Sequence, residues 1–126
     1  MKPIAIIDDD ADVRDVMTFA LENEGHSVIK FENGRDALEG LSLLAFPDLP
    51  CFIIIDYLMP HMDGATFIKE VQLKYPDTLG RIPIALTSAI DSLDPIMKQK
   101  QNLYHIHKPM NLDDLLKLVR DHCKLV

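Results

Sequence analysis

Cysteine and long apolar runs are scarce in this sequence. Cys51 and Cys123 are its only cysteines, no CxxC pair is present, and no histidine stands at zinc-finger spacing. These absences argue against a zinc site and against a disulfide. We interpret the two isolated thiols as small core residues of a protein in a reducing compartment.

No apolar run is long enough to cross a bilayer, and the amino terminus lacks the basic, apolar and small-residue regions of a signal peptide. We therefore expect a cytoplasmic protein that does not associate with membranes. The formal net charge of −7 argues against general attraction to nucleic acid, because phosphates would be repelled.

The length and composition predict one ordinary globular domain. The chain has 126 residues, of which 48% are hydrophobic and 26% are charged, so it can bury one substantial core. It contains no internal repeat, low-complexity tract or linker. We therefore expect residues 1–126 to form a single domain.

Apolar segments alternate five times with segments of helical spacing. The expected strands are residues 3–7, 26–31, 51–55, 82–86 and 104–107. The expected helices are residues 11–24, 33–44, 64–75, a short helix beginning at Asp94-Pro95, and a last helix from Asn111 to about residue 124. This order predicts an α/β fold with a doubly wound, five-stranded parallel sheet and five helices covering both faces.

Polar residues follow four of the five expected strands. Asp8 and Asp9 follow the first strand, Asp56 the third, Thr87 the fourth and Lys108 the fifth. If the strands are parallel, all of these side chains meet at one edge of the sheet, where α/β proteins bind their ligands. Asp10 is better interpreted as a helix cap and Asp63 as a turn residue.

This set of residues predicts phosphoryl transfer. Three neighbouring carboxylates repel one another, and a hard divalent cation such as Mg²⁺ relieves that repulsion. A threonine hydroxyl and a lysine ammonium can hold a phosphate, and an ionised aspartate can attack phosphorus. The product would be an aspartyl phosphate on Asp56. The acids also make a site built on His61, His105 and His107 unfavourable.

Four motifs resemble the receiver domain of two-component response regulators. They are Ile-Ile-Asp-Asp-Asp at 6–10, Ile-Asp-Tyr-Leu-Met-Pro-His-Met-Asp-Gly at 55–64, Ala-Leu-Thr-Ser-Ala at 85–89 and Lys-Pro at 108–109. The resemblance covers essentially the whole chain. It implies a flavodoxin-like (βα)5 fold, a single receiver domain over residues 1–126 and no output domain in this chain.

The resemblance also implies a role for each site residue. Asp56 would accept a phosphoryl group from a phosphohistidine donor, with Thr87 and Lys108 contacting that group. Mg²⁺ would be the cofactor, and a cis peptide bond would precede Pro109. The implied metal site consists of the carboxylates of Asp9 and Asp56 and the backbone carbonyl of Leu58 as direct ligands, with Asp8 acting partly through water.

The sequence departs from the family pattern in two respects. His105 stands where the family usually has a Phe or Tyr that switches together with Thr87, and the polarity of His105 makes inward burial less favourable. Leu58 and Ala89, which flank the approach of water to the phosphoryl group, carry no polar group to orient it. We therefore predict slow self-dephosphorylation.

The resemblance favours a signalling module over an enzyme acting on other substrates. The implied partners are a sensor histidine kinase or histidine phosphotransfer protein, and a downstream protein on the face formed by the fourth helix, fifth strand and last helix. One alternative is a Mg²⁺-dependent phosphohydrolase, although such enzymes typically carry a second aspartate where Leu58 stands. Another alternative is a receiver-like scaffold that is never phosphorylated.

Overall fold

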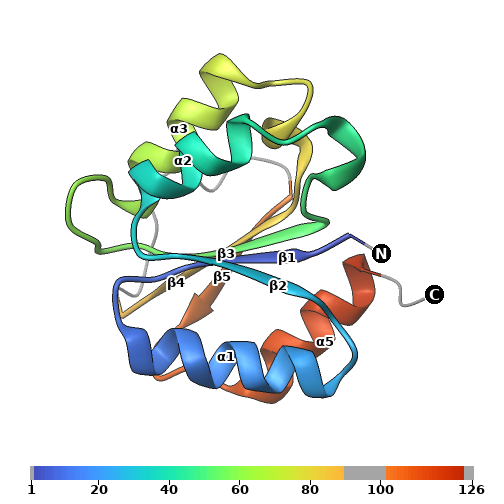
Figure 1. Cartoon of the computed structure of the whole chain (residues 1–126). Coiled ribbons are helices and arrows are strands. Elements are labelled where there is room, and N and C mark those ends of the chain that lie inside the picture. Colours follow the sequence, from blue (N-terminus) through green and yellow to red (C-terminus); the bar gives the residue numbers. More distant parts are fainter. Residues whose placement is uncertain (1, 90–101, 124–126) are drawn as a thin grey trace.

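The computed structural model describes residues 2–89 and 102–123 (Figure 1). The strands are β1 (Ile4–Ile7), β2 (Val28–Phe31), β3 (Phe52–Asp56), β4 (Ile84–Ser88) and β5 (Leu103–His107). The helices are α1 (Ala11–Asn23), α2 (Gly34–Ser42), α3 (Gly64–Lys74) and α5 (Leu112–His122), with short 3₁₀ helices at Phe46–Asp48 and Leu79–Arg81. The short helix expected from Asp94 lies outside the described residues.

The five strands form one parallel sheet in the order β2-β1-β3-β4-β5. The predicted fold class is therefore confirmed. After β2 the chain crosses to the other side of β1 to form β3. The strand order therefore reverses between β1 and β3. Doubly wound sheets bind ligands at the carboxyl ends of the strands beside this reversal.

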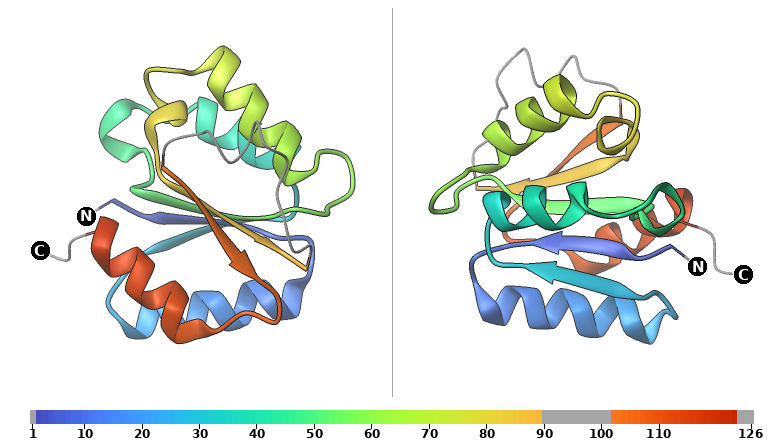
Figure 2. Two further views of the ribbon diagram at one scale, coloured as in Figure 1. Left: turned by 180° about the vertical axis from the view of Figure 1, so that it is seen from behind. Right: turned by 45° about the horizontal axis from the view of Figure 1, so that its top comes forward.

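Successive strand residues point to opposite faces of the sheet and build two cores. In β1 and β3, Ala5, Ile7, Ile53 and Ile55 pack toward α2 and α3, whereas Ile4, Ile6, Phe52 and Ile54 pack toward α1 and α5. Figures 1 and 2 show these two helical layers on opposite sides of the sheet. All eight of these residues are fully or almost fully buried. Burial on both faces explains why the sequences of these strands are unbroken apolar runs.

Polar caps begin the helices where the sequence predicts them. The side chains of Asp10, Asn33 and Asn111 accept hydrogen bonds from backbone N–H groups in the first turns of α1, α2 and α5. Asp63 does more than form a turn, because it caps α3 by accepting a hydrogen bond of 2.7 Å from the N–H of Thr66. Gly25 ends the α1 region with a φ of 97°, a conformation that glycine adopts readily.

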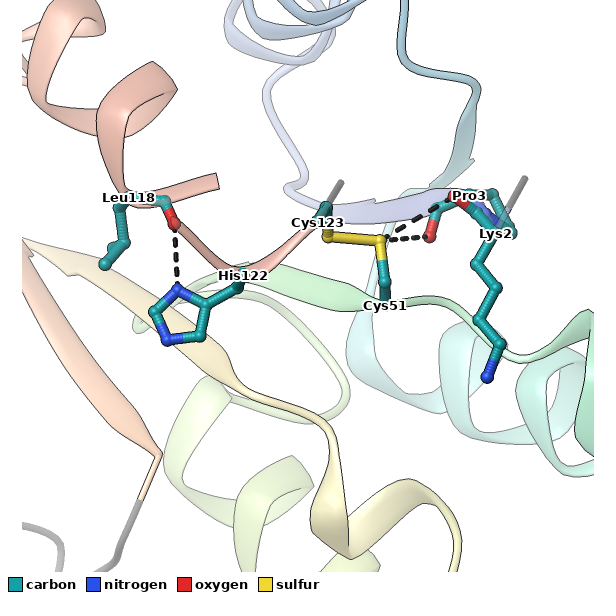
Figure 3. The surroundings of a disulfide bond; sticks show 6 residues. All are labelled: Lys2, Pro3, Cys51, Leu118, His122 and Cys123. Atoms are coloured by element: carbon teal, nitrogen blue, oxygen red, sulfur yellow. Dashed lines mark hydrogen bonds between the residues drawn. A yellow bond between two sulfur atoms is a disulfide. The ribbon is translucent and has the colours of Figure 1, made fainter. Parts of the chain in front are cut away.

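The prediction that the two cysteines are unconnected is wrong. Cys51 and Cys123 form a disulfide, with their Cα atoms 5.9 Å apart (Figure 3). Cys51 directly precedes β3, and Cys123 ends α5, which runs back across the sheet toward the edge where β3 begins. The two cysteines are 72 residues apart in sequence, and only the tertiary fold brings them together, so the sequence did not predict the disulfide.

Among the residues that the structure describes, no helix is long and apolar enough to cross a membrane.

Candidate functional site

Three carboxylates gather beside the reversal in strand order. Asp8 follows β1 directly, Asp9 is next to it, and Asp56 is the last residue of β3. One carboxylate oxygen from each lies within 4.8 Å of the other two. Within residues 2–89 and 102–123, this is the one group of three or more potential metal-ligating side chains that comes together.

Asp8 has an unusual electrostatic environment. It is 1% exposed, and burial raises its pKa from 3.8 to about 6. A hydrogen bond from the N–H of Asp10 opposes this effect, and the negative charge of Asp56 adds to it. The Oδ2 atom of Asp8 is buried without a hydrogen-bond partner. An unpaired buried carboxylate oxygen is unfavourable, so these acids fit a hard cation that prefers oxygen ligands.

Lys108 supplies a positive charge next to Asp56. Its Nζ atom lies 3.1 Å from Oδ1 of Asp56. The backbone holds this lysine in place, because its N–H donates a 2.7 Å hydrogen bond to the carbonyl of Ser88 at the end of β4. The peptide bond between Lys108 and Pro109 is cis.

Thr87 lies opposite Asp56 in the register of β3 and β4. It is buried at the carboxyl end of β4, and its carbonyl accepts a 2.9 Å hydrogen bond from the N–H of Tyr57. A pocket of about 120 Å³ opens beside these strand ends. It is lined by Asp56, Tyr57, Leu58, Ser88, Ala89 and Lys108.

The loop after Asp56 folds back tightly on the end of β3. The N–H of Gly64 donates a 2.9 Å hydrogen bond to the carbonyl of Tyr57. A Cβ atom on Gly64 would lie 2.7 Å from the carbonyl oxygen of Asp56 and equally close to a methyl group of Leu86. Glycine is therefore required for this close approach. Leu58, at the start of the loop, is 71% exposed.

Three interactions near the site could not be predicted from the sequence. The guanidinium Nη1 of Arg14 in α1 donates a 2.6 Å hydrogen bond to the carbonyl of Asp8. The Oγ of Ser88 lies 2.7 Å from Nε2 of His105, and the rings of His105 and His107 contact each other edge to face. His105 is half-buried. Its Nε2 atom has a hydrogen-bond partner in Ser88, the residue next to Thr87.

Comparisons with known proteins identify the family. The family model described as "Response regulator receiver domain" matches residues 4–120. The chain belongs to the response regulator receiver domain family. It is therefore a signalling module of two-component systems, a class of domain that works with histidine kinases or phosphotransfer partners.

Relatives in sequence include proteins of two different sizes. An uncharacterized 14.6 kDa protein encoded in the 3′ region of sodA1 in Leptolyngbya boryana is 32% identical over 121 residues, covering 95% of this chain and 88% of that protein. The DNA-binding transcriptional regulator NtrC of Escherichia coli is 29% identical over 116 residues. The match covers 90% of this receiver domain but 23% of NtrC. The activity of the whole NtrC regulator is therefore not assigned to this chain.

Solved receiver structures share the fold along almost the full chain. The chemotaxis response regulator CheY4 of Vibrio cholerae is 27% identical with a TM-score of 0.79, and the alignment covers 98% of this chain and 99% of that one. A receiver domain of a histidine kinase from Syntrophus aciditrophicus is 28% identical with a TM-score of 0.76, over 94% and 87% of the two chains. Receiver domains generally bind Mg²⁺ in an acidic pocket.

Proposed function

We propose that Asp56 accepts a phosphoryl group from a phosphohistidine on a sensor histidine kinase or histidine phosphotransfer protein. The observation that carries this proposal is the position of the Asp56 carboxylate, which lies close both to the acids that follow β1 and to the ammonium of Lys108. The adjoining pocket of about 120 Å³ gives this carboxylate access to a donor.

The reaction needs a nucleophile and groups that hold the phosphoryl oxygens. An aspartate carboxylate is ordinarily ionised at neutral pH and needs no general base. In the transfer, a carboxylate oxygen of Asp56 bonds to phosphorus while the bond between phosphorus and the histidine nitrogen breaks. Lys108 and Thr87 then contact phosphoryl oxygens and offset their charge.

Asp8, Asp9 and Asp56, with the backbone carbonyl of Leu58, would hold Mg²⁺. The buried Oδ2 of Asp8 supports this assignment, because it has no other partner. When bound, the ion supplies neutralisation of negative charge around the transferring group. Asp8 must be deprotonated to act as a ligand, which its raised pKa opposes in the absence of a cation.

Phosphorylation is expected to change how the domain binds a downstream protein. Thr87 would contact the new phosphoryl group, and Ser88, its neighbour, is bonded to His105. We infer that a shift of Thr87 is transmitted through this pair to β5. The receiving surface would be formed by β5, α5 and the fourth helix, which lies outside the described residues. The cytoplasmic location expected from the sequence remains a prediction.

Intact mass spectrometry after incubation with Mg²⁺ and acetyl phosphate tests the proposal. The wild-type chain should gain one phosphoryl group, and Asp56→Asn should gain none. Asp63→Asn is a matched control, because Asp63 caps α3 in the same loop but lies outside the acid cluster. This variant should be phosphorylated like the wild type.

The same experiment distinguishes the alternative functions. Fast release of phosphate from acetyl phosphate without a stable adduct would favour a phosphohydrolase. No adduct at any Mg²⁺ concentration would favour a scaffold. Leu58 already argues against the hydrolase, because no carboxylate stands two residues after Asp56.

A further inference from the structure

The cysteine pair lies at the edge of the sheet opposite to the acid cluster. Cys51 stands before the first residue of β3, whereas Asp56 is the last residue of that strand. The disulfide therefore takes no part in the proposed phosphoryl chemistry. It connects the start of β3 to the end of α5 (Figure 3).

The surroundings of Cys51 suit a free thiol as well as a disulfide. Its Sγ atom lies 3.7 Å from the carbonyl oxygen of Lys2 and 3.6 Å from that of Pro3. A disulfide sulfur carries no proton, so in the oxidised form these are contacts without hydrogen bonding. A reduced Cys51 thiol carries a proton and would find two acceptors already in place. Neither oxidation state leaves this sulfur unsatisfied.

The helix joined by the disulfide is also held by other contacts. Leu115 and Val119 are fully buried in the core between α5 and the sheet. Nδ1 of His122 donates to the carbonyl of Leu118 at 2.9 Å, so the other ring nitrogen of neutral His122 accepts the 2.8 Å hydrogen bond from the hydroxyl of Tyr104. None of these contacts involves a cysteine sulfur, so we expect α5 to stay in place in the reduced chain.

Solvent reaches the two sulfurs unequally. Cys51 is half-buried and lines a pocket of about 270 Å³, whose charged lining residues are Lys2, Arg81 and Asp77. Cys123 is 6% exposed and belongs to the core that α5 covers. A small reagent can therefore meet Cys51 from this pocket, while Cys123 is shielded.

We propose that Cys51 and Cys123 are a reversible redox pair that reacts with low-molecular-weight disulfides, with Cys51 as the attacking thiol and Cys123 as the resolving thiol. The Cys51 thiolate attacks one sulfur of the oxidant, forming a mixed disulfide and releasing the first thiol. The Cys123 thiolate then attacks the sulfur of Cys51 and releases the second thiol. Two electrons pass to the oxidant, and the two cysteine protons end on the two released thiols.

Glutathione buffers of increasing oxidised fraction test the pair in the full chain. After equilibration, free thiols are alkylated and the intact mass is measured. The wild type should pass from two alkylated cysteines to none, without bound glutathione and without dimer formation. Retention of two free thiols in oxidised glutathione alone, or accumulation of glutathione adducts as the end product, would overturn the proposal.

Single variants separate the two roles. Cys123→Ser should trap one glutathione on Cys51, whereas Cys51→Ser should react at least about tenfold more slowly, because Cys123 is buried. In concentrated urea the two variants should react at similar rates, which shows that folding causes the difference. Equal rates in the folded proteins would contradict the assignment of attacking and resolving thiols.

Hydrogen exchange measures independently how the oxidation state of the cysteine pair affects the end of α5. The N–H of Cys123 is bonded to the carbonyl of Val119 at 2.7 Å. Exchange at the last turn of α5 should be slower in the oxidised wild type than in the reduced wild type, and Cys51→Ser should show no such dependence. Identical exchange in both wild-type forms would show that the bond does not restrain the helix.

Discussion

The ammonium of Lys108 lies 3.1 Å from the carboxylate of Asp56, although 52 residues separate them in sequence. Lys108 is one-third exposed and Asp56 is almost fully buried, so the pair lies at the boundary between the core and solvent. The attraction of this pair is partly screened there. We therefore expect Lys108 to contribute more to chemistry than to stability.

Replacing Lys108 with Gln should slow phosphorylation of Asp56. The cation is lost where negative charge must be held during transfer, and we expect a decrease in rate on the order of 10- to 100-fold. Mg²⁺ affinity, measured by calorimetry, should stay the same or increase, because a positive charge near the acids is removed. Lys74→Gln is the matched control, because Lys74 pairs with Glu70 on the surface of α3. An unchanged initial rate of phosphorylation in Lys108→Gln would count against the proposed role.

Replacing Asp8 with Asn should stabilise the protein at neutral pH without divalent cations. The pKa of Asp8 is raised from 3.8 to about 6 in the folded state, so the folded protein binds the proton more tightly than the unfolded chain. Stability contributed by this group is therefore lost as pH rises from about 4 to 6. The gain in Asp8→Asn should be about 1–3 kcal/mol near pH 7 and disappear near pH 4.

Urea unfolding of the wild type and Asp8→Asn at both pH values, in the presence of a chelator, measures this difference. Added Mg²⁺ should stabilise the wild type more than the variant, because the variant lacks one carboxylate. A stability difference that does not depend on pH would show that the carboxyl group of Asp8 is not the cause.

Replacing Leu58 with Asn should accelerate loss of the phosphoryl group. Leu58 lines the pocket beside Asp56 and offers no polar atom to a water molecule. An amide at this exposed position can orient water, and we expect an increase of several-fold to about tenfold in the dephosphorylation rate. Stability should change by less than about 0.5 kcal/mol, because the side chain is mostly in solvent. A time course of phosphate loss equal to that of the wild type would refute the prediction of slow self-dephosphorylation.

Replacing Gly64 with Ala should destabilise the fold. The added Cβ would meet the carbonyl oxygen of Asp56 at 2.7 Å, and this backbone atom cannot move away without disturbing the end of β3. We expect a loss of about 1–3 kcal/mol in the free energy of unfolding. Gly40→Ala is a comparison in which a side chain is met instead of backbone: its Cβ would lie 2.8 Å from the ring of Phe31, which can shift, and alanine in a helix interior contributes about 0.5–1 kcal/mol relative to glycine. The urea midpoint should fall clearly in Gly64→Ala and little in Gly40→Ala.

Reduction of the disulfide should lower stability without unfolding the domain. For a separation of 72 residues, loss of the cross-link increases the chain entropy of the unfolded state by an amount worth roughly 4 kcal/mol. Urea unfolding with and without reductant measures this effect. Cys51→Ser should unfold at one midpoint under both conditions, and a wild type that behaves in the same way would show that the bond does not stabilise the fold.

Local sequence signals were sufficient to predict most of the fold. The run from Phe52 to Ile55 has no polar face, and a strand with that pattern must be covered on both sides. Helical spacing and the caps at Asp10, Asn33 and Asn111 placed four helices. Strand and helix ends differ from the predicted ends by at most two residues within the described chain. The ends differ because the last turn of a helix and the first residues of a strand carry weak local signals.

Contacts between distant segments could not be predicted in the same way. Cys51 and Cys123 gave no spacing signal, since their proximity depends on how α5 crosses the sheet. The contact of Arg14 with the carbonyl of Asp8 depends on the angle between α1 and β1. The hydrogen bond between Ser88 and His105 depends on the pairing of β4 with β5. Topology placed the strand ends together, but it did not specify which side chains would touch.

Asp8 and Asp56 are each attached to a strand whose residues are buried on both sides. The buried strands therefore set the positions of both carboxylates, and Arg14 of α1 adds one hydrogen bond to the backbone of Asp8. Substitutions on the outer surfaces of the helices are therefore expected to alter contacts with other proteins while leaving the two carboxylates in place.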